Sequence, residues 1–230
     1  MGYVILGLAA AMAFVSTAPE NVAAVEAARA TAINAAVLQM FNHGIITGAL
    51  FLLVGLIYDE RTHVRDFREL GPGLWRTVPR YGSFLLVAAF ASLGLPGLAG
   101  FVSEFFVFRG AFSMGLAGGG AYDGIPLLLL TALSVAGIVV TAAFILWKVV
   151  QVLLLGAQNE RWLDVRDLTT PEMAMLAPLT AIMILYGVYP KPILDLIDSA
   201  TQNLLPSLAP LTGVEATALL EHLTRLSDLL

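Results

Sequence analysis

Apolar stretches and short polar links alternate along this chain, a pattern typical of membrane-spanning helices. The apolar stretches cover residues 1–16, about 30–58, 81–112, 125–155 and 174–189. Because lipid offers no hydrogen-bond partners, the backbone of such a stretch has to bond internally, as an α-helix does. The pattern therefore predicts an all-α integral membrane protein with about five transmembrane helices. We interpret the first stretch as a short or truncated helix rather than a signal peptide.

The third stretch is longer than one membrane span requires and contains residues that break helices. Its roughly 32 residues would extend about 48 Å, against about 30 Å for the hydrocarbon core. Gly94, Pro96 and Gly97 fall inside it. Proline removes a backbone donor and clashes with the carbonyl four residues before it. We predict that this helix is broken over 94–97, beside protein or a water-filled cavity that can satisfy the freed backbone groups.

Arginine is concentrated in two of the polar links, and this asymmetry predicts an orientation. Links 59–80 and 157–172 lie on the same side of the membrane if every helix spans it. Together with Lys148 nearby, that side carries eight of the twelve lysines and arginines. The positive-inside rule then places both links in the cytoplasm. The chain is accordingly predicted to be a multi-pass protein of the cell inner (plasma) membrane.

Residues 193–230 differ from the transmembrane region that we predict over 1–192. Leucine mixes there with acidic and amide residues, and Pro206 and Pro210 are expected to interrupt any helix. Residues 216–230 can form an amphipathic helix, because four leucines share one of its faces: Leu219, Leu220, Leu223 and Leu226. Such a tail is expected to lie on a partner protein or at the membrane surface.

Composition supports the membrane interpretation and removes several kinds of chemistry. The 230 residues are 58% hydrophobic and 13% charged, whereas soluble domains have about 25% charged residues. A net charge of −5 without a basic patch argues against nucleic acid as a partner. The chain has no cysteine, which excludes disulfides, thiolate metal sites and iron–sulfur ligation. Its histidines, His43, His63 and His222, are too far apart for metal-ligand spacing.

Glu104 is an acidic residue within an apolar helix, eight residues after Pro96. An ionised group at the centre of a membrane helix costs about 2.5–3.5 kcal/mol on insertion scales, so its presence needs a reason. Beside a helix break it would lie near hydrated space, where a carboxylate can bind and release a proton. The alternative is a carboxylate that anchors the helix near the interface or pairs with Arg109.

Two more ionisable residues in apolar helices are candidates for proton transfer. His43 shares a helix face with Gln39 and Thr47, four residues away on either side. Imidazole can accept a proton on one nitrogen and release one from the other near neutral pH. Such a polar stripe can line a water wire, or it can simply bond to a neighbouring helix. Lys148 can carry protons when desolvated, or extend its stem to the membrane interface.

Four segments of this sequence together resemble one known family. They are 42–51 (NHGIITGALF), 58–66 (YDERTHVRD), 94–105 (GLPGLAGFVSEF) and 187–195 (GVYPKPILD). These segments are similar to the M subunit of proton-pumping NADH:quinone oxidoreductase, respiratory complex I. Glu104 is the discriminating position, because the L and N subunits and their antiporter relatives usually have lysine after the Gly-Leu-Pro motif. The resemblance covers about residues 1–199.

The resemblance implies a fold and a role for the candidate residues. The chain would correspond to helices ten to fourteen of fourteen, half of an antiporter-like inverted-repeat fold. The break over 94–97 would be the second discontinuous helix. His43 and Glu104 would belong to a hydrated polar axis that carries protons, with Lys148 as a further proton-transfer candidate. The expected function is a proton-translocating membrane-arm subunit, coupled to quinone reduction elsewhere in the complex.

The resemblance also implies partners and cofactors. We expect neighbouring antiporter-like subunits, a chain that supplies the missing N-terminal helices, and lipid. No redox centre or cofactor is expected in this chain, and flavin, iron–sulfur clusters and quinone are expected in partner subunits. Two alternatives remain: a subunit of a sodium–proton antiporter or membrane-bound hydrogenase, and a structural membrane scaffold without an ion path.

Overall fold

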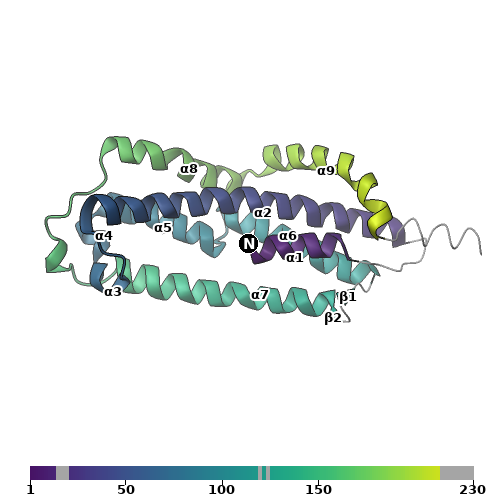
Figure 1. The fold of residues 1–230 in the computed structure, drawn as a ribbon, viewed down its shortest axis with the longest axis horizontal. Coiled ribbons are helices and arrows are strands. Elements are labelled where there is room, and N and C mark those ends of the chain that lie inside the picture. The colour runs from purple at the N-terminus through teal and green to yellow at the C-terminus, as the bar shows by residue number, and fades with distance from the viewer. Residues whose placement is uncertain (14–20, 119–120, 123–124, 213–230) are drawn as a thin grey trace, which may run out of the picture. The chain divides into compact units, whose positions relative to one another are not determined.

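The described part of the chain is almost wholly helical (Figure 1). The computed structural model describes residues 1–13, 21–118, 121–122 and 125–212. They form two compact units: the first contains 1–40, 103–136 and 191–212, and the second contains 41–102 and 137–190. The predicted amphipathic helix over 216–230 and His222 lie outside the described residues. Each unit is built around its own apolar core, which we describe in turn.

The first unit packs a short N-terminal helix against parts of longer ones. Its elements are α1 (Gly2–Ala11), the first part of α2 (Val22–Ile57), the later part of α6 (Ala99–Gly118), the strands β1 (Ala121–Tyr122) and β2 (Ile125–Pro126), the start of α7 (Leu127–Phe144) and α9 (Lys191–Thr212). Its buried core includes Leu6, Ile33, Val107, Met114 and Leu127. Small residues let these helices approach closely, since a Cβ on Gly110 would lie 2.7 Å from the Cα of Ala32.

The helix α2 begins at Val22, eight residues before the start that its hydropathy predicts. The added turns include Arg29, whose side chain is only 1% exposed. Its Nε donates to the Ala11 carbonyl at 2.8 Å, and its NH1 group lies 3.0 Å from the Glu26 carboxylate. An arginine with such partners can be buried. Hydropathy alone placed it outside the helix because those partners are a tertiary feature.

The second unit contains a broken helix and the arginine-rich links. Its elements are the later part of α2, the π-helix η2 (Tyr58–Thr62), α3 (Phe67–Leu70), α4 (Leu74–Thr77), α5 (Pro79–Leu93), the first turn of α6, the later part of α7, the π-helix η3 (Ile145–Leu154), the 3₁₀ turn η4 (Glu160–Trp162) and α8 (Thr170–Val188). Its core is formed by aliphatic residues of these helices, among them Leu53, Leu74, Leu85, Leu154 and Leu176.

The predicted helix break is present between α5 and α6. Helix α5 ends at Leu93, and both Gly94 (φ 78°) and Gly97 (φ 93°) adopt the left-handed conformation that favours glycine. The amide of Leu95 donates back to the Phe90 carbonyl at 3.0 Å, which closes α5 before Pro96. The chain resumes a helix at Ala99. Glycine and proline thus end one helix and leave the five residues 94–98 outside regular structure.

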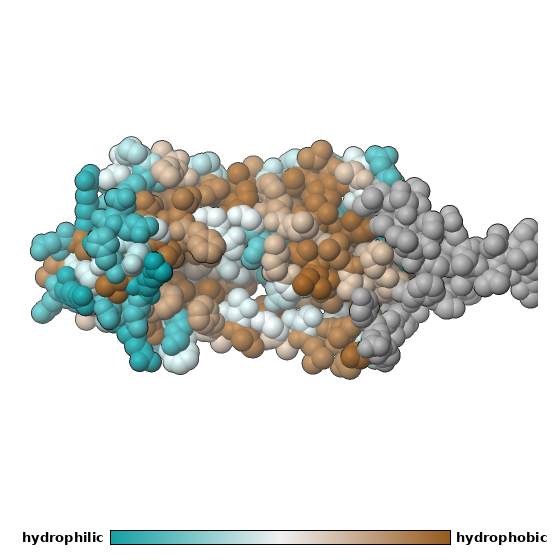
Figure 2. Space-filling view, in the orientation of Figure 1, coloured by the Kyte–Doolittle hydropathy of each residue, from teal (hydrophilic) through white to brown (hydrophobic). Residues whose placement is uncertain are grey.

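Three of the described helices are long and apolar enough to cross a membrane: Val22–Thr62, Leu127–Leu154 and Thr170–Val188. The broken pair α5 and α6 supplies the remaining long apolar stretch, and α1 the short first one. Each of the five predicted apolar stretches therefore contains a helix within its described residues. Hydrophilic side chains gather at the end of the second unit that holds α3 and α4, and hydrophobic ones cover much of its helices (Figure 2).

The prediction that Pro206 and Pro210 interrupt the tail was wrong for the described residues. Helix α9 begins at Lys191 and runs through both prolines to Thr212. Each proline lacks one backbone donor, but residues four apart lie on the same helix face. Both losses therefore fall on one side, where a curved helix can accommodate them while the other side keeps its hydrogen bonds.

Candidate functional site

Glu104 lies in α6 and points into the interior of the first unit. Its side chain is 9% exposed, and Val107, Ala111 and Met114 on the same helix face are fully buried. The Arg109 guanidinium lies 5.9 Å from the ring centroid of Phe106. The four ion pairs found within the described part of the chain do not include Glu104. The carboxyl group is therefore a buried acid without an ion-pair partner among the described residues.

His43 lies in α2, within the second unit, and is half-buried. Its carbonyl accepts a hydrogen bond from Thr47 Oγ1 at 2.6 Å. This bond occupies the threonine hydroxyl hydrogen, so Thr47 contributes an acceptor rather than a free donor to the predicted polar face. Gln39, in the first unit, is 6% exposed, and its Oε1 is buried without a hydrogen-bond partner.

Asn42 is a polar residue near the break whose role the sequence did not reveal. It is 1% exposed, and its Nδ2 donates to the Ala99 carbonyl at 2.8 Å. This bond ties α2 to the first turn of α6, immediately after the break. The available signal was an amide inside an apolar helix, next to His43, but its partner is 57 residues away in sequence.

Lys148 lies in η3 and is half-buried. Its Nζ is 4.4 Å from the ring centroid of Trp147, and that indole is 58% exposed. A lysine over an outward-facing aromatic ring is stabilised by cation–π attraction. Glu104 belongs to the first unit, whereas His43 and Lys148 belong to the second. Across the described residues, no hydrogen bond or ion pair joins these three candidates.

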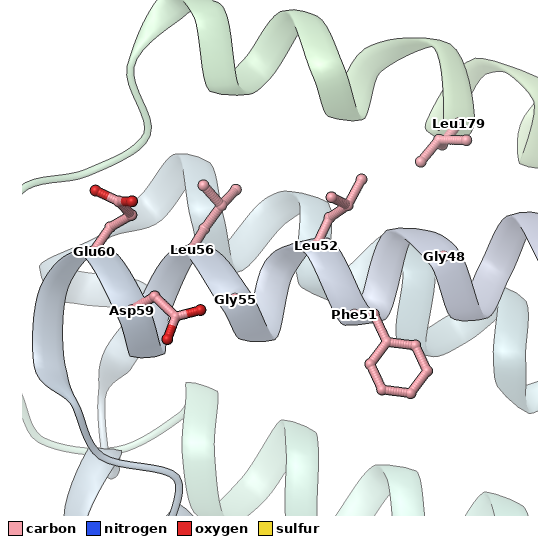
Figure 3. A pocket seen from close by; sticks show the side chains of 8 residues that line it. All are labelled: Gly48, Phe51, Leu52, Gly55, Leu56, Asp59, Glu60 and Leu179. Carbon is pink, nitrogen blue, oxygen red and sulfur yellow. The ribbon is translucent and has the colours of Figure 1, made fainter.

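A groove of about 520 Å³ in the second unit runs along α2 and is separate from the candidate residues. Figure 3 shows Leu52 and Leu56 of α2 on the side of Leu179 from α8, with Asp59 and Glu60 at one end. Its walls are mostly apolar, and neither His43 nor Lys148 lines it. Within the described residues, no group of three or more His, Asp or Glu could hold a metal ion.

Span-length apolar helices, a discontinuous helix and a buried carboxyl group define the class of this protein. Discontinuous helices at membrane depth are typical of proteins that move ions, because their ends supply polar groups inside the bilayer. The chain thus has the helices of a multi-pass membrane protein. A family model described as "NADH:quinone oxidoreductase/Mrp antiporter, TM" matches residues 1–119, more than half of the chain. The chain belongs to this family of antiporter-like membrane proteins.

Similar proteins agree with this assignment. NADH-quinone oxidoreductase subunit M of Rhodobacter capsulatus is 34% identical over 84% of this chain and 35% of that protein. The protein of the same name from Mycobacterium tuberculosis is 35% identical over 74% of this chain and 28% of that protein. F(420)H(2) dehydrogenase subunit M of Methanosarcina mazei is 32% identical over 93% of this chain and 37% of that protein. The chain thus spans about a third of the length of these relatives.

A solved structure supports the fold. A chain of respiratory complex I from Thermus thermophilus, determined with bound NADH, aligns with a TM-score of 0.65 and 24% sequence identity. The alignment covers 89% of this chain and 37% of that chain. The resemblance read from the motifs is therefore confirmed at the level of family and fold, and the chain matches part of an M-type subunit.

Proposed function

We propose that this chain is part of a proton-translocating membrane-arm subunit of NADH:quinone oxidoreductase. The observation that carries the proposal is Glu104, a buried carboxyl group five residues after the helix α6 resumes beyond the break. Placing an acid in an apolar interior is costly, so its presence there indicates a function. Membership of the antiporter-like family and the similarity to M subunits support proton transfer as that use.

In this proposal the chain moves protons by changes in the protonation of fixed side chains. Glu104 takes up a proton and releases it, and His43 does the same through its two ring nitrogens. Lys148 is a third proton-transfer group on the path. Moving one charge across 100 mV costs about 2.3 kcal/mol, so modest field changes at these groups can gate transfer. The redox reaction elsewhere in the complex provides those changes.

The proposal includes a location and partners. Residues 1–192 form the transmembrane region in the cell inner membrane, with links 59–80 and 157–172 in the cytoplasm. Residues 193–230 form a tail on a partner or on the membrane surface. Neighbouring antiporter-like subunits and a chain with the N-terminal helices complete the path. Flavin, iron–sulfur clusters and quinone belong to partner subunits, and this chain binds none of them.

Replacing Glu104 with Gln in the assembled complex tests the proposal. The amide keeps the size of the carboxyl group but cannot carry a proton, so pumping per electron should fall several-fold. The measurement is proton uptake by vesicles during quinone reduction, with Glu160→Gln as the control because Glu160 is exposed on a link. His43→Ala provides an independent second variant. Normal pumping in both variants would favour a structural scaffold instead.

The Methanosarcina mazei relative favours a second candidate for the electron donor. That protein is named as a subunit of a dehydrogenase for F(420)H(2), and its match covers 93% of this chain. A subunit that holds no redox centre can serve with either electron-input module. Purifying the complex through this chain and comparing its oxidation of NADH with its oxidation of F(420)H(2) separates the two.

A further inference from the structure

We infer that Asn42 holds a water molecule at the helix break, and that it is a positioning residue for the proton path. The inference rests on the proposed function for its role in transport, although the water site itself can be tested separately. Asn42 is 1% exposed and contacts the Ala99 carbonyl, both within the second unit.

The amide has one satisfied end and one unsatisfied end. A backbone carbonyl can only accept a hydrogen bond, so the amide end that faces Ala99 must be the nitrogen. That bond, from Nδ2 to the Ala99 carbonyl, is 2.8 Å long. The other end, Oδ1, is buried and has no partner in the chain. A buried acceptor left without a donor costs about 1–3 kcal/mol.

The surroundings of Asn42 indicate what the missing donor is. Ile46, Ala49 and Leu53 continue the same buried face of α2 and offer no side-chain donor. Because Oδ1 is not accessible from the surface, a side chain of a neighbouring subunit cannot reach it. Water is small enough to be enclosed, and buried water typically bonds to polar groups that are otherwise unsatisfied. Carbonyl groups of the adjacent break, each with two lone pairs, can accept its hydrogens.

A fixed water at this position has a direct meaning for proton transfer. Asn42 precedes His43 on α2, and Ala99 lies five residues before Glu104 on α6. One amide therefore joins the two helices that carry the main candidates, and it orients a water at their junction. Asn42 has no titratable group and does not carry the proton. It places the water that does.

Cysteine accessibility tests the water site without any measurement of pumping. The chain has no cysteine, so Asn42→Cys introduces its single thiol. The matched control is Ala49→Cys, which is on the same face of α2 and 2% exposed. Silver ions, applied to the complex in its membrane, bind a thiol that water reaches. The protein is then denatured and alkylated, and mass spectrometry of this chain gives the fraction of the thiol that bound silver and so escaped alkylation.

If the site is hydrated, silver should protect the thiol of Asn42→Cys from alkylation at least about ten-fold faster than that of Ala49→Cys, because thiolate formation needs water. Equal rates would overturn the inference. Fast protection combined with normal pumping in Glu104→Gln would keep the water site and reject the proposed function. Slow protection of Asn42→Cys together with lost pumping in Glu104→Gln would reject the water site and keep the proposed function. The two failures are therefore distinguishable.

A second pair of variants separates a water site from a mere pin between helices. Asn42→Ser keeps a small group that binds water but is too short to span the contact with Ala99. Asn42→Leu keeps the size and removes all hydrogen bonding. We expect several-fold lower proton pumping per electron in the leucine variant and near-normal pumping in the serine variant. Equal losses in both variants would identify Asn42 as a structural pin only.

Discussion

At the scale of single residues, two glycines determine how closely the chain packs around the break. A Cβ on Gly100 would overlap the carbonyl oxygen of Ala91 at the end of α5, and a Cβ on Gly187 of α8 would overlap the carbonyl oxygen of Gly97. Glycine at these positions lets the backbones approach without displacing either helix. The break is therefore held by backbone contacts as well as by the Asn42 bond.

Gly100→Ala should destabilise the second unit by about 1–3 kcal/mol, the usual cost of overpacking, because backbone cannot move aside as a flexible side chain can. Gly48→Ala is the matched control, since nothing lies within 4 Å of a Cβ there. Alanine in that helical position should be neutral or stabilising by up to about 1 kcal/mol. The effects of both substitutions can be measured as the temperature at which half of the complex is inactivated. Equal midpoints for the two variants would contradict the packing described here.

The sequence singles out some candidate residues and misses others for a physical reason. Glu104 and His43 stand out because an ionisable group in an apolar helix is costly wherever the helix packs. Gly94 and Pro96 likewise act through local backbone chemistry, so the break could be predicted. Asn42 could not, because its significance depends on Ala99, which is distant in sequence. Single amide side chains occur in many membrane helices, and only the folded structure shows which of them are buried.

At the scale of elements, one arginine connects η2, which follows α2, to the start of α8. The Arg61 side chain is 7% exposed and donates to both carboxylate oxygens of Glu172 at 2.7 and 2.9 Å. Its other bonds go to three backbone carbonyls, those of Leu56, Arg166 and Asp167. The sequence places this residue in the polar link 59–80 and gives it no partner. The structure shows instead that it fixes the arginine-rich end of the second unit.

The carboxylate of Asp167 completes this end of the unit by capping α5. Its oxygens accept from the amides of Arg80 at 2.9 Å and Tyr81 at 3.1 Å, in the first turn of α5. Those amides have no partner within the helix itself. The first half of the broken helix is therefore anchored at its start by a distant link, and at its end by Gly94. Such capping depends on tertiary structure, so the sequence could not show it.

Removing one member of the Arg61–Glu172 pair should destabilise the second unit by about 1–3 kcal/mol, because the remaining charged group loses its hydrogen bonds at a half-buried position. Arg61→Met and Glu172→Gln are the single variants. Combining them should cost less than the sum of the two, since no uncompensated charge then remains. Thermal inactivation of the four forms gives the coupling. Strict additivity would show that the two side chains act independently.

Helix boundaries were predictable only where apolar residues mark them. Hydropathy placed α5, α7 and α8 nearly as they are found, because lipid-facing and core residues are both apolar. It missed the first turns of α2 and the continuation of α9 through Pro206. The first turns of α2 contain Arg29, whose burial depends on its bond to the Ala11 carbonyl. Local propensity alone does not include that contribution.

At the scale of the whole molecule, the apolar exterior indicates an environment other than water. Leu133, Val139 and Val140 on α7 are each more than 60% exposed. In a soluble protein such a surface would aggregate, whereas in a membrane it contacts lipid or a neighbouring subunit. The chain also spans only about a third of the length of its relatives. Partner helices and lipid together are the expected cover for these faces.

The two ends of the apolar span Leu127–Leu154 allow the proposed orientation to be tested. The span Leu127–Leu154 is about 40 Å long, enough to cross the hydrocarbon core. Ile125 precedes it, and Glu160 lies in the arginine-rich link that follows it, both exposed. Single cysteines at these positions can be labelled with a membrane-impermeant maleimide, because the native chain has no cysteine. Right-side-out and inverted vesicles then present opposite faces to the reagent.

Glu160→Cys should react only in inverted vesicles, whose cytoplasmic face is outward, and Ile125→Cys only in right-side-out ones. The reason is the excess of arginine in links 59–80 and 157–172, because loops rich in positive charge remain on the cytoplasmic side. The reversed pattern would place the arginine-rich links outside the cell. Labelling of both positions from one face would show that the stretch does not cross the membrane. Either result would remove the orientation on which the direction of proton transfer depends.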